Sequence, residues 1–420
     1  MDNNQKTIYV YDDFSFDEPV LLGCLFVNVI RGEESYSFEY DKNWLHNYSY
    51  SMNLDPELLA INGRQYPSGK NIFGVFADAS PDRWGRILMK KKERILADKE
   101  KRKPKKLYDS DYLLGVFDKT RMGGIRFKLV QNGQFLSDDE DAAVPPWATL
   151  RKLEEASRHF ENDEDFEIEK WVNQLIKPGS SLGGARPKAT ILDAEGNLWI
   201  AKFPSRNDEN DTGAWEKVTS DLARMCGLDV PESRLEKFSS LGSTFLVKRF
   251  DRNGDKRIHF ASAMTLLGKT DGASASDGTS YLDIATFIKS NGSDPKKDLV
   301  ELWKRIVFYM AVSNTDDHLK NHAFILTRNG WKLSPMYDVN PVPYGNELSL
   351  LVDDVDNAIS VDLAIKTATK YGISVEEAKQ AANKILAIVN NNWEQLALQY
   401  NLSRSQIENM RPAFDVLNKQ

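Results

Sequence analysis

The stretch from Leu302 to Asp338 constrains the fold more than any other part of the chain. It begins with apolar residues at helical spacing, namely Leu302, Ile306, Tyr309 and Met310. A polar loop, Ser313 to Asn321, follows this helix. Beyond the loop, Asn329-Gly330 separates two short apolar runs, which is a strong signal for a β-hairpin. The pattern therefore predicts a helix, a polar loop and a hairpin in that order.

The polar loop holds the strongest candidates for chemistry. Asp316 and Asn321 stand five positions apart, the spacing by which a kinase catalytic loop offers a carboxylate to the substrate hydroxyl and an amide to Mg²⁺. Asp338 follows the hairpin and can face back to the loop as a second metal ligand. We expect His318 or Lys320 to reach the phosphates of ATP. Taken singly, Asp316 and Asp338 are better explained as turn or cap residues, so the prediction depends on the ordered set.

A small-residue loop and a lysine upstream extend the candidate nucleotide site. Such loops let backbone N–H groups approach phosphate, although this one matches neither G-x-G-x-x-G nor a Walker A sequence. Lys202 shares a strand face with Ile200, so its ammonium needs a partner, which Glu216 can supply as in the Lys–Glu pair of kinases. The alternative for Lys202 is a snorkelling lysine on an edge strand. The loop residues expected at the phosphates are Ser181, Gly183, Gly184, Ala185 and Lys188.

The strand that ends at Arg249 runs directly into charged residues, as a hinge between two lobes would. We expect the backbone from Lys248 to Phe250 to pair with an adenine edge. Asp251 could hold the ribose hydroxyls, or it could simply cap the next turn. In chain order, the sequence thus offers a phosphate loop, a lysine, a glutamate, a hinge, a catalytic loop and a metal-binding aspartate.

Charge and composition narrow the class of protein. A net charge of −7 disfavours a nucleic-acid binder, yet Arg83 to Lys106 contains twelve basic and three acidic residues. That segment is either a solvated helix with a charged linker, or a patch for DNA or an acidic partner. The longest apolar stretch, Val20 to Ile30, is too short to cross a membrane, and the N-terminus lacks a secretory signal. Cys24 and Cys226 do not suggest a disulfide framework, so we expect a cytoplasmic protein.

Local patterns divide the chain into three regions. Residues 1–135 read as a β-rich subdomain with a helical insertion, and residues 136–252 as an αβ region with the phosphate loop. Residues 253–420 read as mainly helical, with capping boxes that begin at Ser374 and Ser403. The predicted fold class is α+β, a bilobal protein-kinase-like fold with an N-terminal β-rich subdomain and an all-helical C-terminal lobe.

The chain resembles HipA-like Ser/Thr protein kinases, the toxin members of HipA/HipB toxin–antitoxin modules. The motifs that carry the resemblance are Ser37–Asp41, Pro81–Arg86, Ser181–Lys188, Ala201–Pro204, Trp215–Lys217, Cys226–Pro231, Val247–Arg252, Asn314–Asn321 and Leu333–Asp338. The resemblance implies that Asp316 is the catalytic base and that Asn321 and Asp338 bind Mg²⁺. It also implies autophosphorylation of the phosphate loop at Ser181, or at the neighbouring Ser180.

The same resemblance implies partners. These are a HipB-like helix-turn-helix antitoxin, operator DNA contacted mainly through that antitoxin, and a protein substrate such as an aminoacyl-tRNA synthetase or another translation factor. Two other readings stay open. The chain could phosphorylate a small molecule or a lipid on the same scaffold, because the ATP machinery says little about the acceptor. It could also be a catalytically idle co-repressor that binds a DNA-bound antitoxin.

Overall fold

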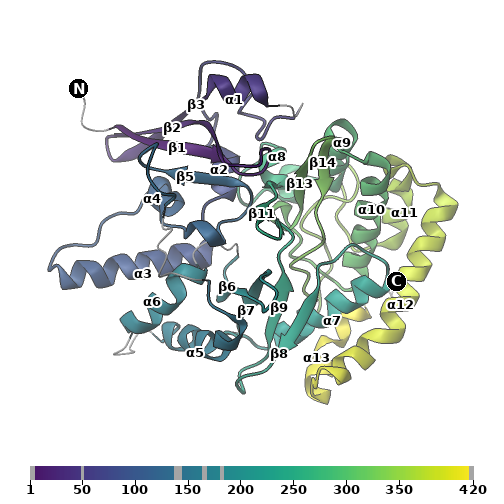
Figure 1. Ribbon diagram of the computed structural model, residues 1–420. Helices are drawn as coiled ribbons and strands as arrows, with labels where there is room; N and C mark the ends of the chain where they lie inside the picture. Colours follow the sequence, from purple (N-terminus) through teal and green to yellow (C-terminus); the bar gives the residue numbers. More distant parts are fainter. Residues whose placement is uncertain (1–4, 49–51, 137–143, 163–167, 180–183, 416–420) are drawn as a thin grey trace. The chain divides into compact units, whose positions relative to one another are not determined.

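The computed structural model describes residues 5–48, 52–136, 144–162, 168–179 and 184–415 (Figure 1). Its contacts divide the chain into two compact units. Unit 1 comprises Met1–Arg206 and Leu246–Ala261, and unit 2 comprises Asn207–Phe245 and Ser262–Gln420. The boundary predicted near residue 135 lies inside unit 1, and the division into three regions stays a prediction.

The N-terminal part of unit 1 is an antiparallel sheet in the order β4-β3-β2-β1-β5. Ile8 and Val10 alternate along β1 and are fully buried, which is the pattern of a strand with one face on the core. Gly23 lies so close to the neighbouring strand that a Cβ there would come within 2.3 Å of the Glu39 carbonyl oxygen. The strands are β1 (Gln5–Asp12), β2 (Val20–Ile30), β3 (Glu33–Tyr40), β4 (Arg64–Gln65) and β5 (Ile125–Lys128).

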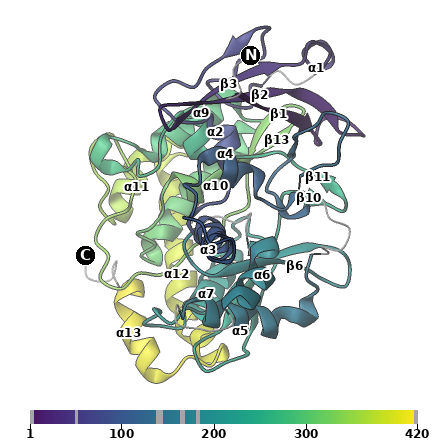
Figure 2. The ribbon, with the colours of Figure 1, turned by 90° about the vertical axis from the view of Figure 1, so that its left-hand side faces the viewer.

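The helices of unit 1 include a packed group, in which α3 and α5 both contact α6 (Figures 1 and 2). Trp84 of α3 meets Phe160 of α5 edge to face at 5.2 Å, and its indole nitrogen donates to the Lys188 carbonyl at 2.9 Å. The helices are α1 (Lys42–Asn47), α2 (Gly74–Asp78), α3 (Arg83–Lys99), α4 (Asp109–Leu114), α5 (Leu150–Phe160) and α6 (Ile168–Gly179), with 3₁₀ turns η1 (Asp118–Thr120) and η2 (Trp147–Thr149).

Short strands form the remainder of unit 1. The hairpin of β6 (Lys188–Leu192) and β7 (Leu198–Lys202) places Lys188 opposite Lys202. The chain re-enters the unit along β9 (Thr244–Lys248) and leaves it along β12 (Phe260–Ser262). Between them, β10 (Arg252–Asn253) pairs with β11 (Lys256–Arg257).

Unit 2 is mainly helical. Helix α12 packs against α7 and α10, and Trp393 stacks on Phe414 of the last helix at 4.4 Å. The predicted capping boxes are confirmed at Ser374 and Ser403. The elements are α7 (Thr212–Met225), β8 (Ser233–Glu236), α8 (Ala263–Leu266), η3 (Ala275–Asp277), α9 (Tyr281–Asn291), α10 (Pro295–Ala311), η4 (Leu319–Asn321), β13 (Ala323–Thr327), β14 (Gly330–Leu333), α11 (Val361–Thr367), η5 (Ala368–Tyr371), α12 (Val375–Gln399) and α13 (Arg404–Phe414).

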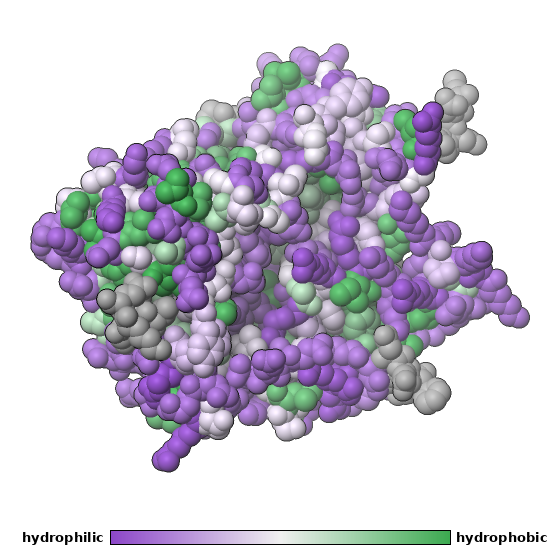
Figure 3. All heavy atoms as spheres, turned by 180° about the vertical axis from the view of Figure 1, so that it is seen from behind, coloured by the Kyte–Doolittle hydropathy of each residue, from purple (hydrophilic) through white to green (hydrophobic). Residues whose placement is uncertain are grey.

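The predicted fold class is confirmed, with a β-rich N-terminal region and a helical C-terminal region. Hydrophilic side chains cover most of the face shown in Figure 3, where hydrophobic side chains gather in separate groups. In the described part of the chain, no helix combines the length and the apolar character needed to cross a membrane.

Candidate active site

The polar loop follows the buried helix α10 in unit 2, as predicted. Asp316 is exposed, whereas Asn321 is buried at 7% exposure. The side-chain amide nitrogen of Asn321 donates to the Asp316 carbonyl at 2.9 Å. This bond fixes the amide, so the Asn321 Oδ1 atom is the one that can bind a cation. The loop therefore presents a solvent-facing carboxylate and an oriented amide oxygen from one short segment.

The segment that carries Asp338 is held against this loop. Asp338 itself has φ of +57°, a left-handed conformation that is uncommon for a residue with a Cβ and is found enriched at functional sites. Three hydrogen bonds tie the two segments together: Tyr337 Oη to the Lys320 carbonyl at 2.6 Å, Asn340 N to Asn314 Oδ1 at 3.1 Å, and Val342 N to the Ser313 carbonyl at 3.0 Å. Asp338 lies between the first two of these anchors in the chain, and its role as a metal ligand stays a prediction.

A buried polar cluster holds the loop at Asp317, the residue next to Asp316. The Asp317 carboxylate accepts a hydrogen bond from the Tyr281 hydroxyl at 2.7 Å and contacts His322 Nε2 at 2.7 Å. All three side chains are at most 1% exposed. Burial, followed by the adjacent Asp317 carboxylate, raises the pKa of Tyr281 well above its ordinary value, so this hydroxyl stays a donor. Sequence reasoning missed the cluster, although the doubled Asp316-Asp317 was a signal for it.

The donor atoms at Asn321 and Asp338 suit Mg²⁺. This ion is usually held by one or two carboxylates together with waters and substrate phosphates, rather than by a full protein cage. Across the described ranges, no group of three or more His, Cys, Asp or Glu residues lies where it could hold a metal. One carboxylate and one amide, from Asp338 and Asn321, agree with this preference of Mg²⁺ for few protein ligands, and the metal site stays a prediction.

The two remaining loop residues have protein contacts of their own. The Lys320 ammonium lies 3.1 Å from Asp271, whose side chain is 66% exposed. Such an exposed pair is weak, so Lys320 can exchange Asp271 for another anion. His318 precedes η4, and its backbone nitrogen donates to the Asp316 carbonyl at 3.2 Å. The phosphate contacts predicted for Lys320 and His318 stay predictions.

The lysines predicted for the phosphates lie in unit 1. Lys188 and Lys202 are 5% and 8% exposed and stand opposite each other on β6 and β7, so their side chains share one face of the hairpin. A Cβ at Gly184 would come within 2.7 Å of the Lys188 ammonium, which places that ammonium beside Gly184. The phosphate contacts predicted for Lys188 and Lys202 stay predictions. Ala185 is exposed beside them, whereas Ser180, Ser181 and Gly183 lie outside the described residues.

The partners of the predicted ion pair belong to different units, Lys202 to unit 1 and Glu216 to unit 2. Glu216 is buried at 5% exposure in the first turns of α7. The pair stays a prediction, as do the adenine contacts expected from Lys248 and Phe250.

The structure favours a different role for Asp251 from the ribose contact considered above. Asp251 is fully buried, and its carboxylate accepts four hydrogen bonds. The donors are Gly123 N at 2.8 Å, Arg249 Nε at 2.8 Å, Arg249 Nη2 at 2.7 Å and Arg252 Nη1 at 2.7 Å. A carboxylate enclosed in this way cannot reach ribose hydroxyls without breaking these bonds, so Asp251 serves the fold.

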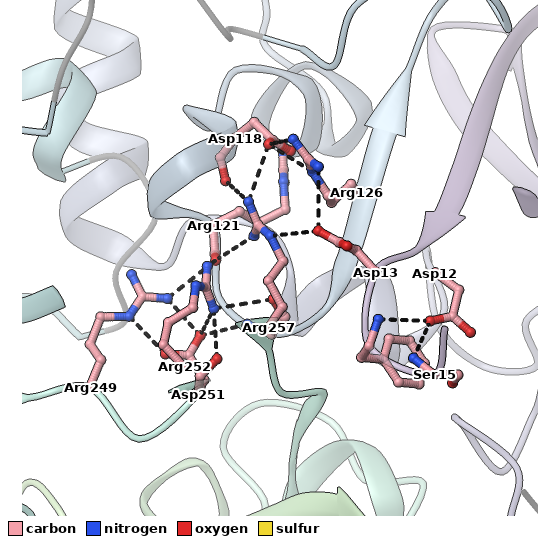
Figure 4. A network of polar contacts seen from close by, with 12 residues as sticks. Asp12, Asp13, Ser15, Asp118, Arg121, Arg126, Arg249, Asp251, Arg252 and Arg257 are labelled. Atoms are coloured by element: carbon pink, nitrogen blue, oxygen red, sulfur yellow. Dashed lines mark hydrogen bonds and ion pairs between the residues drawn. The ribbon is translucent and has the colours of Figure 1, made fainter. Parts of the chain in front are cut away.

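Asp251 belongs to a buried charge network inside unit 1 (Figure 4). Three carboxylates face five guanidinium groups in it, namely Asp13, Asp118 and Asp251 with Arg121, Arg126, Arg249, Arg252 and Arg257. Burial raises the pKa of Asp118, but Arg257 and Arg126 outweigh burial and hold it below its usual value. Burial also lowers the pKa of Arg121 to about 9. The network ties the returning segment 246–261 to the rest of unit 1.

Comparison with known proteins links these features to a family. The family model described as "HipA-like C-terminal domain" matches residues 180–393. A candidate kinase of Haemophilus influenzae is 28% identical over 214 residues, covering 44% of this chain and 61% of that protein. The Serine/threonine-protein kinase toxin HipA of Shewanella oneidensis is 24% identical over 246 residues, covering 50% of this chain and 55% of that protein. The chain thus spans 61% and 55% of the lengths of these two relatives.

A solved structure shares the fold along nearly the whole chain. It is the complex of HipA, HipB and operator DNA from the toxin–antitoxin system of Shewanella oneidensis. The likeness covers 98% of this chain and 97% of that one, with a TM-score of 0.69 and 16% sequence identity. At this identity, the likeness establishes the kinase-like fold.

Proposed function

Because this chain belongs to the family of proteins with a HipA-like C-terminal domain, we propose that it is a protein kinase that uses ATP and Mg²⁺. The acceptor is a Ser or Thr hydroxyl of a protein. The observation that carries the proposal is the hydrogen-bonded arrangement in unit 2, which holds Asp338 against the loop of Asp316 and Asn321. A polar loop without a role in chemistry would not need an exposed carboxylate beside an oriented amide and a strained aspartate.

Each residue has a chemical role in this proposal. The exposed Asp316 carboxylate accepts the proton of the acceptor hydroxyl while that oxygen bonds to the γ-phosphorus and the bond from the γ-phosphorus to ADP breaks. Asn321 and Asp338 would hold Mg²⁺, which when bound neutralises charge on the phosphates. Lys188 and Lys202 attract the phosphates from the hairpin of unit 1. The buried Asp317 positions the loop through Tyr281 and His322.

The relatives support a proposal for the biological role. One relative is named as a kinase toxin, and the structural neighbour is bound to HipB and operator DNA. We propose that this chain likewise acts as a growth-inhibiting toxin in the cytoplasm, bound by a HipB-like antitoxin that makes the main contacts with DNA. Its substrate would be an aminoacyl-tRNA synthetase or another translation factor. Autophosphorylation at Ser181 or Ser180 would switch it off.

Phosphotransfer tests the enzymatic part. Incubation with ATP and Mg²⁺ should add about 80 Da to the phosphate loop, as one phosphoryl group does. Asp316→Asn should abolish this gain with the fold retained, whereas Asp362→Asn, at an exposed position of α11, should not. If nucleotide binding is undetectable by calorimetry, the kinase proposal is wrong.

Growth after induced expression tests the toxin role. Wild type should arrest growth and Asp316→Asn should not, and phosphoproteomics after induction would name the substrate. Arrest by both proteins would favour the idle co-repressor. Phosphorylated metabolites or lipids without phosphorylated proteins would favour a small-molecule or lipid kinase.

A further inference from the structure

Helix α3 carries a row of like charges on one face. Arg86, Lys90 and Arg94 are spaced four residues apart, so each lies one turn above the last. Like charges at this spacing destabilise a helix, because the side chains are neighbours on its surface. Lys90 and Arg94 are exposed, whereas Arg86 is anchored by Asp109 at 2.9 Å and lies 4.3 Å over the Tyr112 ring. The row therefore lowers the stability of α3, and the helix by itself gives no reason for placing these cations together.

The chain beyond α3 adds two more cations to the same place. After α3 it turns back towards α4 (Figure 1). The Glu93 side chain holds this returning segment, since it pairs with Arg102 and accepts a hydrogen bond from Lys105 N at 2.7 Å. Lys105 and Lys106 are exposed and line the same hollow as the α3 row. Positive side chains from two segments thus line one hollow, and Glu93, the carboxylate in its lining, already pairs with Arg102.

These residues line a half-open hollow with a volume of about 490 Å³. Its charged lining consists of Arg86, Lys90, Arg94, Lys105 and Lys106, with Glu93 as the acid. Within the described ranges, no ion pair joins Lys90, Arg94, Lys105 or Lys106 to a carboxylate. The Lys106 ammonium donates to the Gly32 carbonyl at 3.4 Å, outside this lining. Lys90, Arg94 and Lys105 are therefore the cations left to face a space of the size at which proteins bind small molecules.

We propose that this pocket binds a small ligand that carries several linked phosphate groups. The Arg94 guanidinium can hold two phosphate oxygens at once, and the ammonium groups of Lys90 and Lys105 supply point charges for the other phosphates. Duplex DNA would suit a single row of cations along a surface, whereas here the cations come from two segments, α3 and residues 104–107, on either side of a hollow. The site is separate from the residues proposed for catalysis, none of which lines this pocket.

Titration calorimetry with inorganic tripolyphosphate tests the inference. The full chain should be titrated in the presence of saturating ATP and Mg²⁺, with Asp316→Asn as background so that ATP is not consumed. Lys90→Glu and Arg94→Glu should each weaken binding about tenfold or more, since each removes a charge-assisted contact and adds repulsion. Lys92→Glu is the matched control, because Lys92 is an exposed residue of the same helix outside the pocket.

Three outcomes would overturn the inference. The first is undetectable binding of tripolyphosphate to the wild-type pocket. The second is equal weakening by all three substitutions, which would indicate only the general charge of α3. The third is tight binding of a DNA duplex under conditions where tripolyphosphate does not compete, which would indicate a nucleic-acid surface. Retention of the circular dichroism spectrum by each variant ensures that lost binding reports on the pocket and not on the fold.

Discussion

Replacing Asp251 by asparagine tests whether the buried charge network holds unit 1 together. The substitution is nearly isosteric, but it removes one of three carboxylates that face five guanidinium groups. In the wild type, four N–H groups donate to Asp251. Asparagine keeps one acceptor oxygen and turns an NH₂ group towards donors, so part of the network loses its partner.

The expected cost is large because the site is dry. Asp251 and Arg249 are 0% and 1% exposed at their side chains, so water cannot replace the lost contacts. Breaking a buried pair by removing one partner costs about 3–5 kcal/mol. For a unit of this size, that corresponds to a fall in melting temperature of roughly 6–20 °C.

Differential scanning calorimetry and urea unfolding of the full chain measure this loss. The matched control is Asp17→Asn, because Asp17 also pairs with a basic residue of segment 246–261, Lys256 at 3.3 Å, but is 98% exposed. We expect the control to melt with the wild type. An Asp251→Asn protein that is as stable as the control would refute the reasoning, since it would mean that the network adds nothing to the fold.

The same residue predicts an acid dependence. Burial alone would raise the pKa of Asp251, but Arg249 and Arg252 outweigh burial and hold it below the ordinary value of 3.8. A carboxylate with a lowered folded-state pKa contributes stability that is complete above pH 3.8 and is lost as pH falls towards the folded-state value. Unfolding followed below pH 4 should therefore show a shallower loss of stability for Asp251→Asn than for wild type. Parallel curves would contradict this assignment.

Three further predictions concern unit 2. Tyr281→Phe removes the donor to Asp317, so a buried carboxylate loses a partner. The free energy of unfolding measured in urea should fall by about 1–3 kcal/mol, and an unchanged midpoint would count against a stabilising role of the cluster. Tyr337→Phe removes the hydrogen bond to the Lys320 carbonyl, so it should misplace Asp338 and slow phosphotransfer about ten- to a hundredfold. The control is Tyr344→Phe, which should match the wild-type rate because Tyr344 is 77% exposed. Gly345→Ala would bring a Cβ within 2.4 Å of Thr315 Cγ2, so it should destabilise the protein by about 1–3 kcal/mol. The control is Asn346→Ala, and equal melting temperatures for the two variants would contradict the clash.

Features set by neighbours in the chain could be predicted from the sequence. The box at Ser374 pairs two N–H groups at the start of α12, those of Ser374 and Glu377, and it depends on a glutamate three residues away. The turn at Asn329-Gly330 joins β13 to β14 because glycine tolerates the φ of +129° found there. In both cases, the interaction is local enough to be visible in a short window.

Asp251 shows where such reasoning ends. A cap, a ribose contact and a buried ion pair all suit an aspartate after a strand, and only its partners distinguish them. One partner, Gly123, is 128 positions away in the chain, and the arginines that surround Asp251 look like solvated surface when read locally. Asp316 and Asp317 pose the same problem at closer range, because they are adjacent and identical in type. Asp317 is buried and accepts a hydrogen bond from Tyr281, which lies 36 positions upstream. Only this distant contact shows that Asp317 supports the loop and that Asp316 is the aspartate that faces solvent.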